Sequence, residues 1–326
     1  MRIAIIAAAV AAFLVTASEL GAQALSPNVD KRAIDDAWSQ PSLIQELSTN
    51  KPIAFTPPPE SEIPDNEFGR SVREGLAIFT NTHILAKDYV GDGLRCSNCH
   101  LDAGRRGGAA PMWGAWVKYP QFRSKNHRVN TIGLRIQGCF RFSMNGAPPP
   151  EDGEIMTALQ SYMFWLARYA PTGGKLEGTG FPALPTPSQP PSIERGKAVF
   201  EQKCAACHNT NGQGRKLAGV AGYQFPPLWG PDSFNWGAGM AGVNTAAAFI
   251  KANMPFGLRD ALTDQEAWDV AMYVNSRPRP QDPRFTGDVA ETRKKFHSSK
   301  WSLYGTERDG VLLGDPNTYP LKVLAD

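Results

Sequence analysis

The chain carries one short pattern twice, as CSNCH at residues 96–100 and as CAACH at residues 204–208. Two thiols at this spacing can add to the two vinyl groups of one haem, and the histidine that follows can bind the iron, so the pattern is typical of c-type haem attachment. A zinc site would need four ligands close together, and the Cys and His residues of this chain are not grouped in that way. The sequence therefore predicts two covalently bound haem c groups. The attachment residues are Cys96, Cys99, Cys204 and Cys207, and the proximal iron ligands are His100 and His208.

Helical periodicity precedes both patterns. Residues 192–214 read SIERGKAVFEQKCAACHNTNGQG and place Ile193, Val199 and Phe200 at a helical spacing before a Gly-rich loop. Residues 68–82, FGRSVREGLAIFTNT, have the same character upstream of the first pattern. We therefore expect a helix to lead toward each attachment site.

Each half also ends in a predicted amphipathic helix, over residues 150–171 and over residues 262–280. The second of these opens with Thr263 and Glu266, the spacing of a capping box. Helix, attachment pattern, irregular loop and closing helix, in that order and occurring twice, resemble two class I cytochrome c domains. The predicted fold is mainly α, with two such domains joined by a Pro/Gly-rich linker.

The N-terminus indicates export. Arg2, an apolar stretch over residues 3–15 and a small-x-small site at residues 22–24 favour a cleaved signal peptide over an uncleaved membrane anchor. No later stretch is long and apolar enough for a second span, so we expect no membrane span in the mature chain and a periplasmic location. The formal charge of +3, without a basic run, argues against a nucleic-acid partner.

Composition divides the rest of the chain. Residues 171–191 are rich in Pro and Gly, which is typical of an interdomain linker. Residues 281–326 are polar, and we expect a loop-rich extension that packs on the surface and has no assignable chemistry. The predicted parts are a signal peptide (1–24), an N-terminal cytochrome c domain (25–170), the linker (171–191), a C-terminal cytochrome c domain (192–280) and the extension (281–326).

Spacing and ligand chemistry offer two candidates for the distal ligand of each iron. In the second half, Met254 lies shortly before the closing helix, where a class I domain supplies a methionine sulfur, and Met240 is its rival. In the first half the same count favours Met144, whereas thiolate chemistry favours Cys139. The remaining histidines, His83, His127 and His297, are more often ordinary surface or core residues than ligands.

Cys139 is the one cysteine outside the attachment patterns, so no disulfide partner is left for it. A free cysteine is usually an inert buried residue, and the residues alone leave this reading open beside that of an iron ligand. If residues 135–139 are helical, Arg135 lies on the same face as Cys139 because the two are four residues apart.

Three segments, RIQGCFRFSMNG (135–146), FPPLWGPDSFNWGAGM (225–240) and the closing helix with the residues before it, resemble the dihaem thiosulfate dehydrogenases over about residues 68–280. The family also has a relative in the His/Cys-ligated haem subunit of the Sox system. The resemblance implies His100 and Cys139 as ligands of an active-site haem, Arg135 as a substrate-binding residue, and His208 and Met254 as ligands of an electron-relaying haem. Two positions depart from the family: Phe142 stands where an Arg is common, and Asn253 is next to Met254, with Lys251 nearby, whereas in some members a Lys competes with this Met as ligand.

The implied activity is the oxidative coupling of two thiosulfates to tetrathionate, with electrons passed to a periplasmic acceptor such as a small cytochrome c. Two dianions repel each other, so fixed cations are required. Arg135 and Arg128 are the first candidates. Further candidates are Arg123, Lys125, Arg105 and Arg106. The alternatives are a non-catalytic dihaem electron carrier, a dihaem peroxidase, and tetrathionate reduction at the same site.

Overall fold

The computed structural model describes residues 52–320 except residues 174, 217 and 220–221. All of them belong to one compact unit, Ser48–Asp326. The predicted signal peptide lies outside the described residues. Within them, no helix has the length and apolar character needed to cross a membrane.

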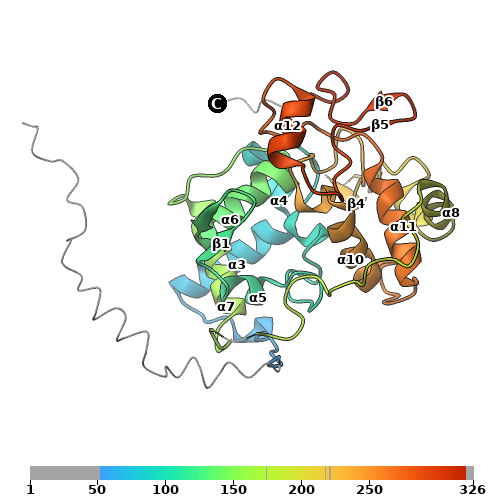
Figure 1. Ribbon diagram of the computed structural model, residues 1–326. Coiled ribbons are helices and arrows are strands. Elements are labelled where there is room, and N and C mark those ends of the chain that lie inside the picture. Colours follow the sequence, from blue (N-terminus) through green and yellow to red (C-terminus); the bar gives the residue numbers. More distant parts are fainter. Residues whose placement is uncertain (1–51, 174, 217, 220–221, 321–326) are drawn as a thin grey trace, which may run out of the picture. The chain divides into compact units, whose positions relative to one another are not determined.

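The first half is organised around helices α3 (Glu67–Thr80) and α7 (Glu154–Leu166), which pack against each other (Figure 1). The Asn66 side chain caps α3 by accepting a hydrogen bond from the Gly69 amide at 3.0 Å. Both predicted helices are confirmed. The other elements of this half are η1 (Glu60–Glu62), α4 (Thr82–Leu85), η2 (Lys87–Tyr89), η3 (Cys96–Asn98), α5 (Met112–Trp116), β1 (Gln121–Arg123), β2 (Arg128–Asn130), α6 (Ile132–Gly138) and the π-helical turn η4 (Cys139–Ser143).

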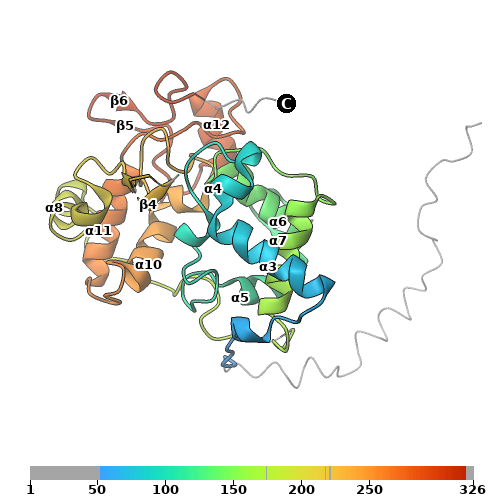
Figure 2. The same ribbon diagram turned by 180° about the vertical axis from the view of Figure 1, so that it is seen from behind.

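The second half repeats this plan with α8 (Ile193–Lys203) packed on α11 (Asp264–Asn275), while α10 (Val243–Asn253) packs on α11 (Figure 2). The predicted capping box is confirmed, because Thr263 and Glu266 exchange hydrogen bonds at the start of α11. The other elements are α9 (Ala205–His208), β3 (Arg215–Lys216), β4 (Tyr223–Phe225) and η5 (Gly239–Ala241).

The two helix pairs meet through the same device, a glycine at the crossing point. A Cβ added at Gly75 of α3 would collide with the backbone carbonyl of Ala158 on α7, and one added at Gly196 of α8 would collide with the carbonyl of Asp269 on α11. Only glycine allows the backbones to approach this closely. The two halves therefore share a helix-packing geometry as well as an order of elements.

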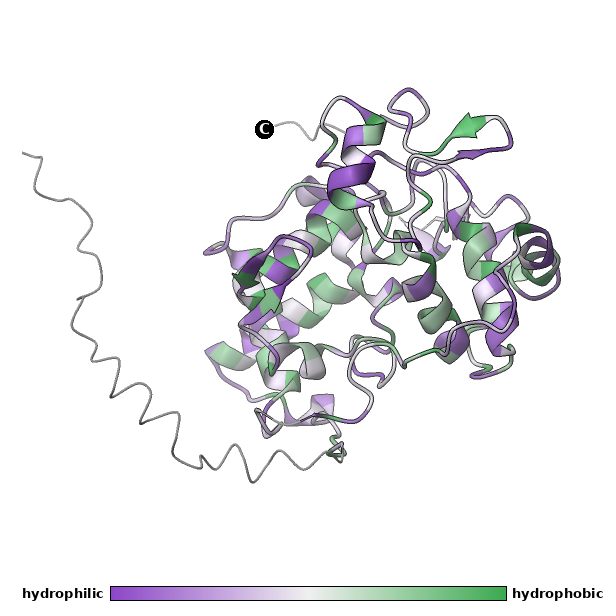
Figure 3. Ribbon diagram, in the orientation of Figure 1, coloured by the Kyte–Doolittle hydropathy of each residue, from purple (hydrophilic) through white to green (hydrophobic). Residues whose placement is uncertain are grey.

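Residues 281–320 correct the expectation of a surface extension. They form α12 (Val289–Phe296) and the hairpin of β5 (Glu307–Arg308) and β6 (Val311–Leu312), and Figure 3 shows that α12 is largely hydrophilic. Between these elements, however, Tyr304 and Leu313 are fully buried in the largest hydrophobic core, where the Tyr304 ring lies 5.8 Å from that of Trp236. Isolated apolar residues in irregular segments have no periodicity, so the sequence pattern did not reveal them.

The predicted linker contains no helix or strand among its described residues, yet it is hydrogen-bonded to both halves. Gly178 accepts from the Gly108 amide at 2.7 Å, and Pro185 accepts from the indole of Trp268 on α11 at 2.8 Å. The segment is therefore packed along the folded unit by hydrogen bonds to both halves. The domain boundaries on either side of it stay a prediction.

Candidate functional site

The first attachment pattern has the donors that a covalent c-type haem requires. Neither Cys96 nor Cys99 is engaged in a disulfide, so both sulfurs are available for attachment to a haem. The His100 ring is held by a 2.8 Å hydrogen bond between Nδ1 and the Ala110 carbonyl. With Nδ1 engaged by a carbonyl, Nε2 is the nitrogen left to bind a metal. The residues present therefore fit a haem attached here.

The second pattern repeats this arrangement. Neither Cys204 nor Cys207 is engaged in a disulfide. His208, at the end of α9, makes a 2.8 Å hydrogen bond from Nδ1 to the Pro226 carbonyl, and burial lowers the pKa of its ring. A neutral ring with one nitrogen free is the form that binds iron. The described residues contain no cluster of three or more His, Cys, Asp or Glu that would suit a zinc ion instead.

Cys139 lies where α6 passes into η4, and π-helical turns of this kind are frequent at functional sites. The Arg135 guanidinium donates to Cys139 Sγ at 2.8 Å, from one turn earlier, as the spacing predicts. Burial raises the pKa of the thiol, but the charge of Arg135 and a hydrogen bond with His100 outweigh it, and the pKa lies at about 7. The structure thus brings His100, Arg135 and Cys139 together.

Met144, the alternative ligand by position, lies in a different setting. Its side chain is buried in the main hydrophobic core, and its backbone closes the turn by donating to the Cys139 carbonyl at 2.9 Å. The sulfur near His100 and Arg135 is that of Cys139.

The two methionines considered for the second haem border the same apolar cluster. Met254 directly follows α10, and both Met254 and Met240 pack against an apolar cluster that contains Phe249. The ammonium of Lys251 is engaged elsewhere, because it donates to the Leu262 carbonyl at 2.8 Å and lies 3.7 Å from the Asp260 carboxylate.

The remaining histidines have other surroundings. His127 is exposed in the turn between β1 and β2, and His83 lies close to Gly222. His297 is buried, with one ring nitrogen 3.2 Å from Ser302 Oγ and the other 2.9 Å from Asp282 Oδ2.

The predicted cations are distributed unequally around Cys139. Arg128 is exposed on β2, directly across the hairpin from Arg123, and its guanidinium makes no hydrogen bond or ion pair with any residue that the structure describes. Arg105 and Arg106 lie over the rings of Trp165 and Phe256. Lys125 instead reaches the ring of Phe142, 4.1 Å from its centroid.

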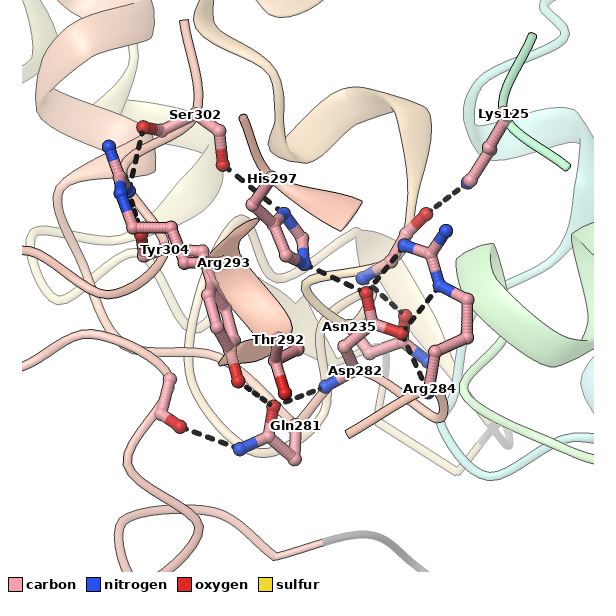
Figure 4. A network of polar contacts seen from close by, with 12 residues as sticks. Lys125, Asn235, Gln281, Asp282, Arg284, Thr292, Arg293, His297, Ser302 and Tyr304 are labelled. Carbon is pink, nitrogen blue, oxygen red and sulfur yellow. Dashed lines mark hydrogen bonds and ion pairs between the residues drawn. The ribbon is translucent and has the colours of Figure 1, made fainter. Parts of the chain in front are cut away.

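Residues 281–320 contain a polar cluster that the sequence pattern did not predict. The Asp282 carboxylate accepts two hydrogen bonds from the Arg284 guanidinium, at 3.0 and 2.6 Å, beside its contact with His297 (Figure 4). The Arg284 guanidinium lies 5.1 Å from the centroid of Phe142. No sequence signal pointed to this contact, because Arg284 and Phe142 are brought together only by folding.

Comparison with protein families assigns each half of the chain to a cytochrome c domain. Residues 87–171 match the family described as SoxA/TsdA, cytochrome c domain, and residues 193–278 match the family described as Cytochrome c. The protein therefore has two mainly helical cytochrome c domains and carries two covalently bound haems.

Relatives that match 80% of this chain identify the family more specifically. A thiosulfate dehydrogenase of Thiomonas intermedia (strain K12) is 54% identical over 80% of this chain and 82% of its own length. One from Stutzerimonas stutzeri (strain A1501) is 51% identical over 80% of this chain and 85% of its own. The solved as-isolated form of the thiosulfate dehydrogenase TsdBA from Marichromatium purpuratum is 48% identical with a TM-score of 0.77; the match covers 80% of this chain and 57% of that one. The chain belongs to the thiosulfate dehydrogenase family.

Proposed function

We propose that this protein is a periplasmic dihaem oxidoreductase that couples two thiosulfates to tetrathionate and passes two electrons to a carrier such as a small cytochrome c. Support comes from its relatives, which are named thiosulfate dehydrogenases. The single structural observation that carries the proposal is the 2.8 Å hydrogen bond from the Arg135 guanidinium to Cys139 Sγ, with His100 of the first attachment pattern near that sulfur.

The proposed iron ligands are His100 and Cys139 at the first haem and His208 and Met254 at the second. Each haem supplies a one-electron redox centre. Two such centres in one chain match a reaction that releases two electrons.

The residues around Cys139 support a stepwise coupling. The Arg135 guanidinium holds the sulfonate of a first thiosulfate, because a guanidinium pairs with oxyanions through two parallel hydrogen bonds. The Cys139 thiolate and the outer sulfur of that thiosulfate form an S–S bond with loss of two electrons to the redox centres. The outer sulfur of a second thiosulfate attacks this sulfur, the tetrathionate S–S bond forms, and Cys139 leaves as a thiolate.

The test uses the full chain with both haems oxidised. Adding thiosulfate should reduce the haems, seen as the sharp absorbance band of reduced haem c, and should form one tetrathionate for every two thiosulfates and two electrons. Sulfate, which has no outer sulfur, should reduce neither haem. Haems that stay oxidised with thiosulfate but accept electrons from a small redox protein would show a non-catalytic carrier instead.

A further inference from the structure

Lys125 places a positive charge beside Phe142, which lies three residues after the reactive cysteine. Its ammonium lies 4.1 Å from the centroid of Phe142 and donates to the Gly237 carbonyl. Phe142 belongs to η4, the same π-helical turn that begins at Cys139. Lys125 lies in the turn between β1 and β2, exposed as a residue, but its ammonium is directed inward, and burial lowers the pKa of that group to about 8, so it remains mostly charged near neutral pH.

This charge has no direct counter-ion. Among the residues that the structure describes, no carboxylate lies within ion-pair distance of Lys125. The carboxylate that acts on it from further away is Asp282. That group is already engaged by Arg284, at 2.6 Å, and by His297, at 2.9 Å (Figure 4).

The surroundings of Phe142 are therefore cationic. Arg284 lies over the same ring, 5.1 Å from the centroid, and the Lys125 charge is close enough to interact with those of Arg135 and Cys139. Arg284 is paired with Asp282, so Lys125 is the cation here without an ion-pair partner among the described residues, and such a charge near a reactive group attracts and orients anions. The site thus has one cation hydrogen-bonded to the sulfur and a second over the Phe142 ring, without an ion-pair partner among the described residues.

The coupling of two thiosulfates needs two anion positions, since each substrate carries two negative charges. Arg135 is bound to the Cys139 sulfur and can hold only the thiosulfate beside it. We propose that the Lys125 ammonium holds the second thiosulfate dianion, and that Asp282, with Arg284 and His297 engaging its carboxylate, leaves that ammonium available. This inference rests on the function proposed above.

Tetrathionate is the probe, because its two sulfonate ends would occupy both positions at once. Its binding to the fully oxidised holoenzyme is measured by calorimetry, without an electron donor, so that no turnover occurs. Loss of one charged contact should weaken binding about tenfold to a hundredfold in Lys125→Met. Lys125→Arg, which keeps the charge, should bind close to wild type.

Lys216→Met is the matched control, because the Lys216 ammonium also lies over an aromatic ring, 5.2 Å from that of Tyr223, away from Cys139. It should bind tetrathionate as wild type does. The inference is overturned if Lys125→Met binds normally, or if Lys216→Met is weakened equally. If the wild-type protein neither binds tetrathionate nor is reduced by thiosulfate, the proposed function itself fails. Unchanged optical spectra of both haems in Lys125→Met would show that the variant is folded around them.

Discussion

At the scale of single residues, the first site depends on one sulfur and its two neighbours. Cys139 ends α6 and begins η4, so its side chain is held at a point where the helix changes geometry. Arg135 and His100 offset the effect of burial and favour the thiolate. A thiolate is both a strong iron ligand and a good nucleophile, and the proposed reaction uses both properties.

Replacing Cys139 with Ala or Met should therefore lower the rate of thiosulfate oxidation by on the order of a hundredfold or more, while both haems stay attached. Cys139 is not an attachment residue, so haem content measured by pyridine haemochrome should not change. Met144→Leu, which conserves core volume, is the control and should keep wild-type turnover. Near-normal turnover in either Cys139 variant, with loss in Met144→Leu, would make Met144 the ligand.

Replacing Arg135 with Lys should raise the KM for thiosulfate about tenfold, because an ammonium does not form the paired hydrogen bonds that a guanidinium forms with a sulfonate. Steady-state kinetics with a saturating electron acceptor provide the measurement. Arg128→Lys should leave KM unchanged, since Arg128 is exposed on β2 without a polar contact to any described residue. A larger effect at Arg128 than at Arg135 would return Arg128 to the substrate site.

At the scale of elements, each half depends on a helix pair that meets at a glycine. In the second half, Gly196 of α8 lies against the Asp269 carbonyl of α11, and an added Cβ would collide with that backbone. Backbone atoms of a helix cannot move aside as the end of a flexible side chain can. The crossing is therefore intolerant of any other residue, although alanine is the better helix former.

Gly196→Ala should lower the free energy of unfolding by about 1–3 kcal/mol, because overpacking forces α8 away from α11. Urea unfolding followed by circular dichroism measures this change. Lys197→Ala, on the exposed face of the same helix, loses only a 3.8 Å surface ion pair with Glu201 and should cost less than about 1 kcal/mol. Equal stability of Gly196→Ala and wild type would show that the helices can shift without penalty.

At the scale of the whole molecule, the C-terminal residues 281–320 contact the turn that begins at Cys139, because Arg284 lies over the ring of Phe142. Burial raises the pKa of Asp282, but His297 and Arg284 outweigh it and hold that pKa well below its usual range. Burial lowers the pKa of His297, and its contact with Asp282 offsets this only in part. In both cases unfolding takes up protons, so the contribution to stability is present near neutral pH and is lost as pH falls.

The free energy of unfolding should therefore fall below about pH 6.5, as the unfolded chain protonates His297, and fall further below about pH 4, as it protonates Asp282. Asp282→Asn should lower it by about 3 kcal/mol at pH 7, because Arg284 loses its buried partner, and should flatten its pH dependence below pH 5. Urea titrations at a series of pH values test this. Glu291→Gln, in an exposed pair with Lys295, should change both quantities much less than Asp282→Asn does, and an equal flattening there would rule out Asp282 as the source.

The sequence by itself determined the two haem attachments, the helices that flank them and the cap of α11, because each is encoded by residues within a few positions of one another. It also indicated the family, through the segment around Cys139 and Arg135. Only the tertiary structure decided that Lys125, and not Arg128, reaches η4, that Arg284 lies against Phe142, and that Tyr304 belongs to the interior. These contacts join residues far apart in the chain, and side-chain packing selects them without leaving a local pattern. The two crossing glycines show the same limit: their residue type is visible in the sequence, but its necessity appears only when the opposite backbone lies against them.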